Sequence, residues 1–191
     1  MTRDARRLLA VSAVLLLATC GHAPTPAQDK KPAAAPAAGP LVTRERVQLN
    51  LAGAELILAA AKQKAGAGGW KMNIAVVDDG GHLLAFARMD GARPASGYTA
   101  LTKAVTAATF RQETGPLPPK GEPDVLLNLS LQNAAAASGG KVTTLKGGVP
   151  VVVDGQVIGA VGVGGGSGEQ DAEVARAGIA ALLDALGGKK P

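Results

Sequence analysis

The sequence predicts an α+β domain in which an antiparallel β-sheet is flanked by α-helices. Two pairs of short apolar segments are joined by turn residues, which is typical of β-hairpins. Segments with helical periodicity lie before, between and after these pairs. No strand–helix–strand unit is repeated, so a parallel sheet is not indicated.

The composition allows one domain and extra segments, and it does not favour nucleic-acid binding. The chain has 191 residues and a net charge of +5, but Arg3, Arg6, Arg7, Lys189 and Lys190 lie at its ends. Aromatic residues make up only 2% of the chain, which argues against base stacking. The core is therefore expected to consist of Ala, Val, Leu and Ile.

The N-terminal segment predicts export. A short basic stretch and an apolar run precede Cys20 in residues 1–20, as in a bacterial lipoprotein signal with Cys20 as the lipidated residue. The alternative is a soluble secreted protein that is cleaved after Ala27. Residues 21–40 are rich in Pro and Ala and predict a linker, followed by the folded domain over 41–188. Cys20 is the only cysteine, so neither an intrachain disulfide nor a multi-cysteine metal site is expected.

The first half of the domain predicts a helix, a hairpin and a second helix. Apolar residues recur at helical spacing over 42–65, with Thr43 as a candidate cap. Strands are expected over 71–78 and 82–88, because residues 78–81 read DDGG and tolerate positive φ. A helix over 96–112 carries a face of small residues that permits close packing.

The second half predicts a loop, a short helix, strands and a final helix. A loop is expected over 115–123, followed by a helix that Asp124 caps. Residues 141–165 suggest three short strands, with a tight turn at Asp154–Gly155. The last helix is expected over 167–186, where Ser167 and Gln170 have the spacing of a capping box.

Three stretches in this order resemble the GlcG/HbpS-like family, which includes the C-terminal domain of the PduO proteins. They are NIAVVDDGGHLLAFARMDGA, YTALTKAVTAATF and GGVPVVVDGQVIGAVGVGGGSGEQDAEVARAG, and the resemblance covers residues 42–188. It implies an antiparallel sheet flanked by helices, homo-oligomers that are often octamers, and heme or tetrapyrrole binding in several members. Some members sense heme or redox state beside a membrane kinase, and others belong to glycolate or corrinoid metabolism. One departure is Gly164, which stands where the family usually has a hydroxyl.

The resemblance makes His82 a candidate axial ligand of heme iron. Imidazole is the commonest protein ligand of that iron, although a histidine after a turn also bonds to nearby carbonyl groups. Thr106 offers a hydroxyl, and Lys103, three residues before it on the same helix face, offers a charge for a heme propionate. Arg88 is a further candidate partner of a propionate. Each of these side chains also has an ordinary structural interpretation, in packing or in solvent.

The other polar motifs indicate local structure more than chemistry. GVGGGSG before the last helix suggests either an anion cradle or a strand–helix junction that needs small residues. Glu169, Asp171 and Glu173 complement the helix dipole, and Asp78–Asp79 suits a turn. No hydrolase triad, nucleophilic cysteine of the domain or carboxylate–histidine metal motif is apparent.

The sequence thus predicts an exported, oligomeric heme-binding protein that scavenges heme or reports it to a membrane sensor partner. Its membrane contact would be the lipid anchor, at the periplasmic or cell surface. Two alternatives remain: an accessory domain that handles a corrinoid or a small molecule in glycolate or diol metabolism, and a structural lipoprotein without a ligand.

Overall fold

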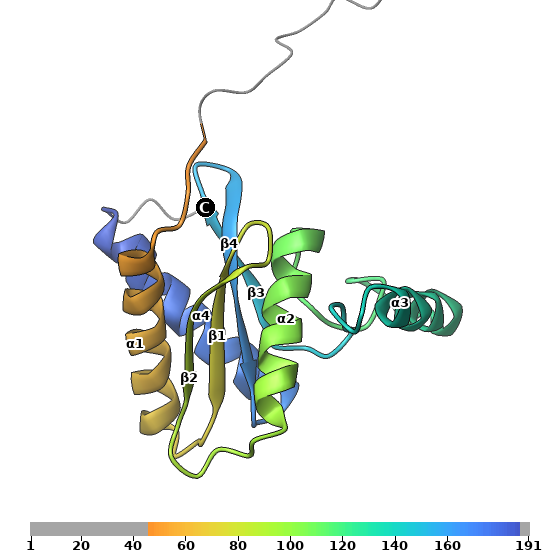
Figure 1. The fold of residues 1–191 in the computed structure, drawn as a ribbon, viewed down its shortest axis with the longest axis horizontal. Coiled ribbons are helices and arrows are strands. Elements are labelled where there is room, and N and C mark those ends of the chain that lie inside the picture. Colours follow the sequence, from red (N-terminus) through yellow and green to blue (C-terminus); the bar gives the residue numbers. More distant parts are fainter. Residues whose placement is uncertain (1–45, 188–191) are drawn as a thin grey trace, which may run out of the picture. The chain divides into compact units, whose positions relative to one another are not determined.

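A computed structural model describes residues 46–187 of the chain. Within these residues, four strands form one antiparallel sheet in the order β2-β1-β4-β3. Helices α1 and α4 pack on one face and α2 packs on the other, so the predicted α+β class is confirmed (Figure 1). The predicted signal segment 1–20 with Cys20, the linker 21–40 and the domain start at 41 lie outside the described residues. Within the described residues, no helix is long and apolar enough to cross a membrane.

The first hairpin is confirmed close to its predicted bounds. Strand β1 is Asn73–Asp78 and β2 is Leu83–Arg88. Ala75 pairs with Phe86 and Val77 pairs with Leu83, which leaves Leu84 as the extra residue of a β-bulge. Because of this bulge, Leu83 and Phe86 project to the same face of the sheet although they are three residues apart.

The second hairpin contains two strands, so the expectation of three strands over 141–165 was wrong. Strand β3 is Gly148–Val153 and β4 is Gln156–Gly164. Asp154 and Gly155 both have positive φ, as the tight turn requires. Residues 141–145 hold no strand: the Thr143 N–H donates to Thr106 Oγ1 on α2, at 3.0 Å, and not to the edge of β3.

Helix α1, Leu51–Ala67, begins later than the sequence pattern suggested. Asn50 caps it by accepting a hydrogen bond from the Gly53 N–H at 2.8 Å. Thr43, the predicted cap, lies outside the described residues. Helix α4, Gly168–Ala185, has the predicted capping box of Ser167 and Gln170.

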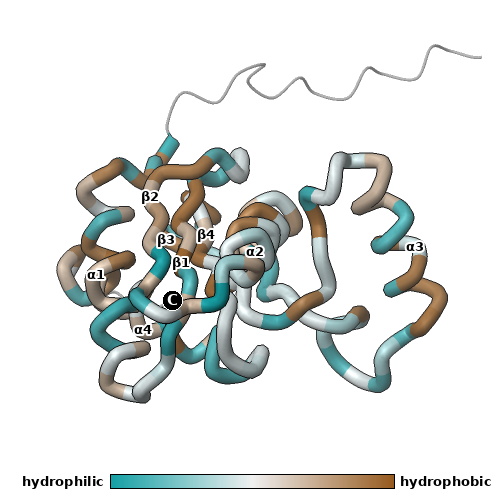
Figure 2. Tube along the Cα trace, turned by 60° about the horizontal axis from the view of Figure 1, so that its bottom comes forward, coloured by the Kyte–Doolittle hydropathy of each residue, from teal (hydrophilic) through white to brown (hydrophobic). Residues whose placement is uncertain are grey.

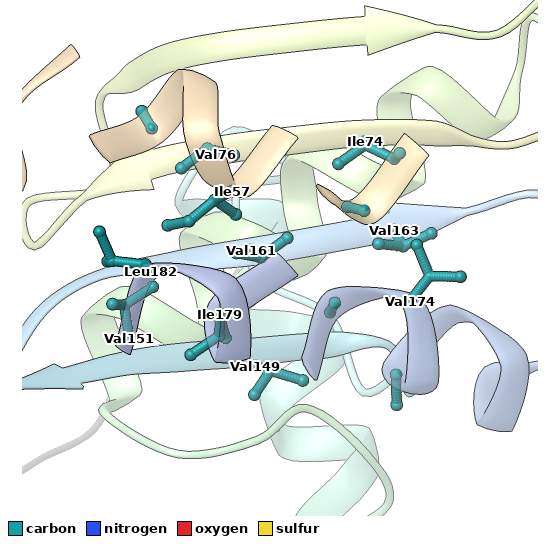
Figure 3. Packing of buried hydrophobic residues seen from close by; sticks show 14 of the residues in the cluster. Ile57, Ile74, Val76, Val149, Val151, Val161, Val163, Val174, Ile179 and Leu182 are labelled. Carbon is teal, nitrogen blue, oxygen red and sulfur yellow. The ribbon is translucent and has the colours of Figure 1, made fainter. Parts of the chain in front are cut away.

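The larger core lies between α1, α4 and the sheet (Figure 3). Ile57 and Val174 from the helices meet Ile74, Val76 and other branched residues of the strands. These four side chains are fully buried. Branched side chains suit a pleated surface because they fill it with little loss of rotamer freedom.

The opposite face of the sheet is packed through small residues, as the sequence predicted. Helix α2, Ser96–Phe110, places Ala100, Ala104 and Ala107 on β1 and β4. A Cβ atom on Gly162 of β4 would lie only 2.1 Å from the Ala100 carbonyl oxygen, so the helix backbone rests directly on the strand.

Helix α3, Val125–Ala137, lies apart from the sheet on an arm between α2 and β3 (Figures 1 and 2). Asp124 caps it by accepting from the Leu127 N–H at 2.9 Å, as predicted. Asn128 fastens the preceding loop, since its side chain exchanges hydrogen bonds with both backbone groups of Leu117. Val125, Leu126 and Leu129 are nevertheless exposed, which leaves the helix with an uncovered apolar surface.

Candidate functional site

An apolar cleft of about 520 Å³ opens between the edge strand β2 and the first turns of α2. Such a volume suits a small organic ligand. Its lining residues come from β2, from the turn before α2 and from α2 itself: Leu83, Phe86, Arg88, Pro94, Ala95, Gly97, Tyr98 and Leu101.

The cleft follows from where α2 sits on the sheet. Helix α2 covers β1, β4 and β3, and it leaves the same face of β2 uncovered. The bulge at Leu84 directs both Leu83 and Phe86 into this uncovered space. Phe86 is 43% exposed and Tyr98 is 81% exposed, so two aromatic side chains border the cleft in a chain with few aromatic residues.

One end of the cleft is polar. Arg88 lies opposite Asn73 in the β1–β2 register, so both side chains are on the α2 side of the sheet. Asn73 is fully buried, and its Nδ2 donates to the Arg93 carbonyl at 3.0 Å. Its Oδ1 has no hydrogen-bond partner among the described residues. A Cβ atom on Gly97 would lie 3.6 Å from Asn73 Oδ1 and 3.4 Å from the Phe86 ring. Gly97 therefore lies between the Asn73 amide and the cleft, and only its backbone separates the two.

His82 lies in a different place, on the face of the sheet that α1 covers. It borders a polar pocket of about 390 Å³ together with Arg46, Asp78, Asp79, Leu84 and others. Leu84 packs against the larger core and Ile158 belongs to it, which fixes the side of the sheet. The His82 Nδ1 is 3.2 Å from Asp78 Oδ2, and Arg46 forms an ion pair with Asp79.

Asp78 organises this turn. Its Oδ1 accepts hydrogen bonds from the Gly80 and His82 N–H groups at 2.9 and 2.8 Å, in agreement with the predicted turn role. Partial burial raises the pKa of the Asp78 carboxyl, but the two backbone hydrogen bonds and His82 together hold that pKa below its ordinary value.

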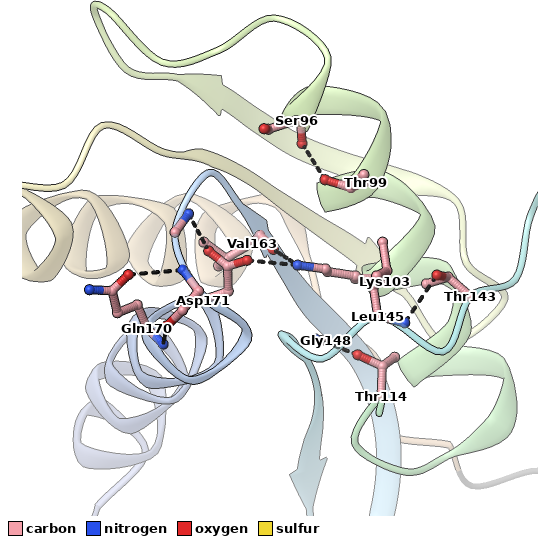
Figure 4. A network of polar contacts seen from close by, with 12 residues as sticks. Ser96, Thr99, Lys103, Thr114, Thr143, Leu145, Gly148, Val163, Gln170 and Asp171 are labelled. Carbon is pink, nitrogen blue, oxygen red and sulfur yellow. Dashed lines mark hydrogen bonds and ion pairs between the residues drawn. The ribbon is translucent and has the colours of Figure 1, made fainter. Parts of the chain in front are cut away.

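Lys103 is buried in an ion pair (Figure 4). Its Nζ is 2.7 Å from Asp171 Oδ2 and donates to the Val163 carbonyl at 2.9 Å. The side chains of Lys103 and Asp171 are only 6% and 2% exposed. The ammonium group therefore joins α2 to β4 and α4, and it is turned away from the cleft and from the His82 pocket.

Thr106 is also buried, and its hydroxyl joins two segments. It donates to the Thr102 carbonyl at 2.7 Å and accepts from the Thr143 N–H at 3.0 Å. The second bond ties the segment that returns from α3 to β3 onto α2. In this arrangement Thr106 faces neither the cleft nor His82.

The glycine-rich segment before α4 fits a strand–helix junction better than an anion cradle. The Gly166 N–H donates to Asp171 Oδ1 and the Ser167 N–H donates to Gln170 Oε1, at 3.0 and 2.9 Å, so these donors are engaged. A Cβ atom on Gly164 would lie 2.6 Å from both the Ser96 carbonyl oxygen and Thr99 Oγ1, which accounts for glycine at this departure from the family pattern.

The two glutamates of α4 are paired with lysines. Glu169 and Glu173 bind Lys146 and Lys64 at 2.6 and 2.7 Å. In the part of the chain that the structure describes, no cluster of three His, Cys, Asp or Glu side chains is arranged to hold a metal ion.

The four site residues predicted within the domain are therefore dispersed. Arg88 lines the cleft, His82 lies on the opposite face of the sheet, and Lys103 and Thr106 are buried in structural contacts. Phe86, Tyr98 and Asn73 were not recognised from the sequence. Two features of the sequence could have identified them. Tyr98 and Phe86 are two of very few aromatic residues, and Asn73 is a polar residue at an inward position of a buried strand.

The sheet order, the two helical layers and the apolar cleft at the sheet edge together define a small α+β domain. Residues 49–180 match the family model described as haem degrading protein HbpS-like. The chain belongs to this HbpS-like family.

Named relatives agree with this assignment. Protein GlcG of Escherichia coli K12 is 46% identical over 120 residues, which are 63% of this chain and 84% of GlcG. A crystal structure of a Streptomyces reticuli HbpS double mutant is 33% identical with a TM-score of 0.60, covering 77% of this chain and 99% of HbpS. The crystal structure of a PduOC–heme complex is 29% identical with a TM-score of 0.59, covering 71% of this chain and 95% of PduOC.

Proposed function

We propose that the protein binds heme, or a related tetrapyrrole, in the cleft between β2 and α2. The observation that carries the proposal is the combination of apolar walls with one cation, Arg88, at the rim. Heme has the complementary chemistry, because its flat faces are apolar and its propionates are anionic.

The residues of the cleft fit such a ligand. Leu83, Phe86 and Leu101 offer apolar contact from two elements, and aromatic rings stack well on flat conjugated groups. Arg88 has a planar guanidinium that donates two parallel hydrogen bonds to a carboxylate. Bound heme would supply an iron centre for redox or gas chemistry. The structural relative PduOC was crystallised as a complex with heme, which supports this choice of ligand.

We also propose that the protein is a homo-oligomer. The support is α3, whose Val125, Leu126 and Leu129 side chains are 69%, 76% and 55% exposed. The helix has no charged residue, and a helix of this length is marginal in water unless it packs. A second copy of the chain offers the same uncharged surface, as a two-fold interface requires.

We also propose that the protein is exported and that it scavenges or senses heme outside the cytoplasm. The support for export is the sequence of residues 1–20, and the most specific version of this proposal is that Cys20 is lipidated. Intact-mass spectrometry of the protein from its membrane fraction tests this point. A diacylglyceryl adduct that is lost in Cys20→Ser is expected, whereas cleavage after Ala27 would select the soluble secreted form.

The binding proposal is tested by a hemin titration of the full chain, followed by Soret absorbance. Saturable binding is expected, and Arg88→Glu should weaken it about tenfold, since a charge-assisted hydrogen bond contributes about 1.5–3 kcal/mol. Arg46→Glu makes the same charge change in the His82 pocket and serves as the matched control. No saturable binding would refute heme as the ligand. Weakening by Arg46→Glu alone would place the ligand with His82.

A further inference from the structure

We infer that the Tyr98 phenol oxygen is the iron ligand of heme in this cleft, bound as the phenolate. This inference rests on the proposed function, because it concerns the same cleft and ligand. It replaces His82, the ligand suggested by the sequence, with a side chain that borders the cleft itself.

The donor chemistry of the cleft points to Tyr98. Among the side chains that line it, only Arg88 and Tyr98 carry nitrogen or oxygen atoms. The guanidinium group stays protonated and has no lone pair for a metal. A tyrosine phenolate, in contrast, is an established ligand of ferric heme in proteins.

The position of Tyr98 also suits a bound phenolate. The residue is the third of α2, in the first turn of the helix that forms one wall of the cleft. Its side chain is 81% exposed and its ring borders the cleft, so the oxygen is accessible to a ligand entering from solvent.

The other candidate ligands face elsewhere within one protomer. The His82 ring is beside Asp78 in the pocket on the α1 side of the sheet. The Thr106 hydroxyl is buried and holds Thr102 and Thr143. Neither residue lines the cleft.

The binding step conserves charge and needs no oxidant. The phenol O–H bond breaks, its proton passes to water, and the oxygen lone pair forms the bond to ferric iron, which remains ferric. A solvent molecule or chloride leaves the iron. Since the ligand must be deprotonated, hemin binding at neutral pH releases about one proton.

Spectroscopy of the full chain with hemin tests the inference. We compare the native protein with Tyr98→Phe, which keeps the ring and removes only the oxygen, and with His82→Ala. Resonance Raman excitation in the visible region should show phenolate ring modes and an iron–oxygen stretch in the native protein and in His82→Ala. Both signals should be absent from Tyr98→Phe, with hemin dissociation at least tenfold faster.

The outcomes separate this inference from the proposed function. Saturable hemin binding with an identical spectrum in Tyr98→Phe would overturn Tyr98 as the ligand and leave heme binding intact. An imidazole spectrum lost in His82→Ala would assign the iron to His82. No saturable binding by the native chain would overturn the proposed function and Tyr98 together.

Discussion

Lys103 and Asp171 form a buried ion pair, and each of the two residues is expected to contribute strongly to the stability of the fold. Their pair is almost inaccessible to solvent, and Asp171 also accepts from the Gly166 N–H. Removing one partner leaves the other charge uncompensated, so Lys103→Met should lower the free energy of unfolding by about 3–5 kcal/mol. Urea denaturation followed by circular dichroism measures this change.

The matched control for that variant is the double variant Lys103→Met/Asp171→Asn. It removes both charges, and it should recover part of the stability that Lys103→Met loses. Equal stability of the native protein and the single variant would contradict the interpretation of the pair as a structural link between α2 and α4.

Asp78 gives a prediction for pH. The pKa of its carboxyl is lowered in the folded protein, so its stabilising effect is complete above the ordinary carboxyl pKa and is lost as the pH falls through the folded value. The difference in unfolding free energy between the native protein and Asp78→Asn should therefore shrink below about pH 4. Urea denaturation at a series of pH values measures it.

Glu55→Gln, an exposed change on α1, is the control for the Asp78 experiment. It removes one carboxylate at an exposed position outside the turn, so it reports the effect of losing a surface charge alone. A difference for Asp78→Asn that stayed constant down to pH 3 would show that the turn does not depend on the charge of Asp78.

At the scale of elements, the contact between α2 and β4 depends on glycine. A Cβ atom on Gly162 would meet both the Ala100 carbonyl oxygen and the Ala104 nitrogen, at 2.1 and 2.3 Å. Gly162→Ala should therefore destabilise the domain by about 1–3 kcal/mol or more, since the helix must move off the strand. Thermal unfolding followed by circular dichroism records the change.

Gly66→Ala makes the same chemical change in an open position. Gly66 lies within α1 and a Cβ atom there would meet no other atom within 4 Å. It should stabilise the protein by about 0.4–1 kcal/mol, because alanine loses less backbone entropy in a helix. If Gly162→Ala and Gly66→Ala changed the unfolding temperature alike, the close packing of α2 on β4 would not depend on the absence of a side chain at Gly162.

The elements that the sequence predicted well carry local signals. Asp154–Gly155 fixes a hairpin, and Ser167 with Gln170 fixes the start of α4. The start of α1 was misplaced because Asn50, a good cap, lies inside a longer apolar pattern. Residues 141–145 contain β-branched residues that favour a strand, but this segment bonds to α2, which local propensity does not reveal.

At the scale of the whole molecule, the sequence could not place the site. His82, Lys103, Thr106 and Arg88 each had a chemical rationale, and the topology separates them onto two sheet faces and the interior. Only the offset of α2 from β2 and the bulge at Leu84 create the cleft. Both are tertiary features without a sequence motif.

The exposed surface of α3 leads to a prediction about assembly. Leu126→Glu/Leu129→Glu should shift the protein to a smaller species in analytical ultracentrifugation, since charge is costly in an apolar interface. The helix content should be retained. Gln132→Glu, an exposed polar position of the same helix, is the control and should assemble like the native chain. A native chain that sediments as a monomer would contradict homo-oligomerisation.

We propose heme as the occupant of the cleft between β2 and α2, and NMR of the hemin-bound full chain can locate it there. Ferric heme is paramagnetic and broadens the signals of nearby nuclei. We predict that the amide signals of Phe86, Gly97 and Leu101 disappear on hemin addition, while those of Gln48 and Gly80, in the His82 pocket, persist. Broadening of Gln48 and Gly80, with the cleft signals intact, would contradict this proposal.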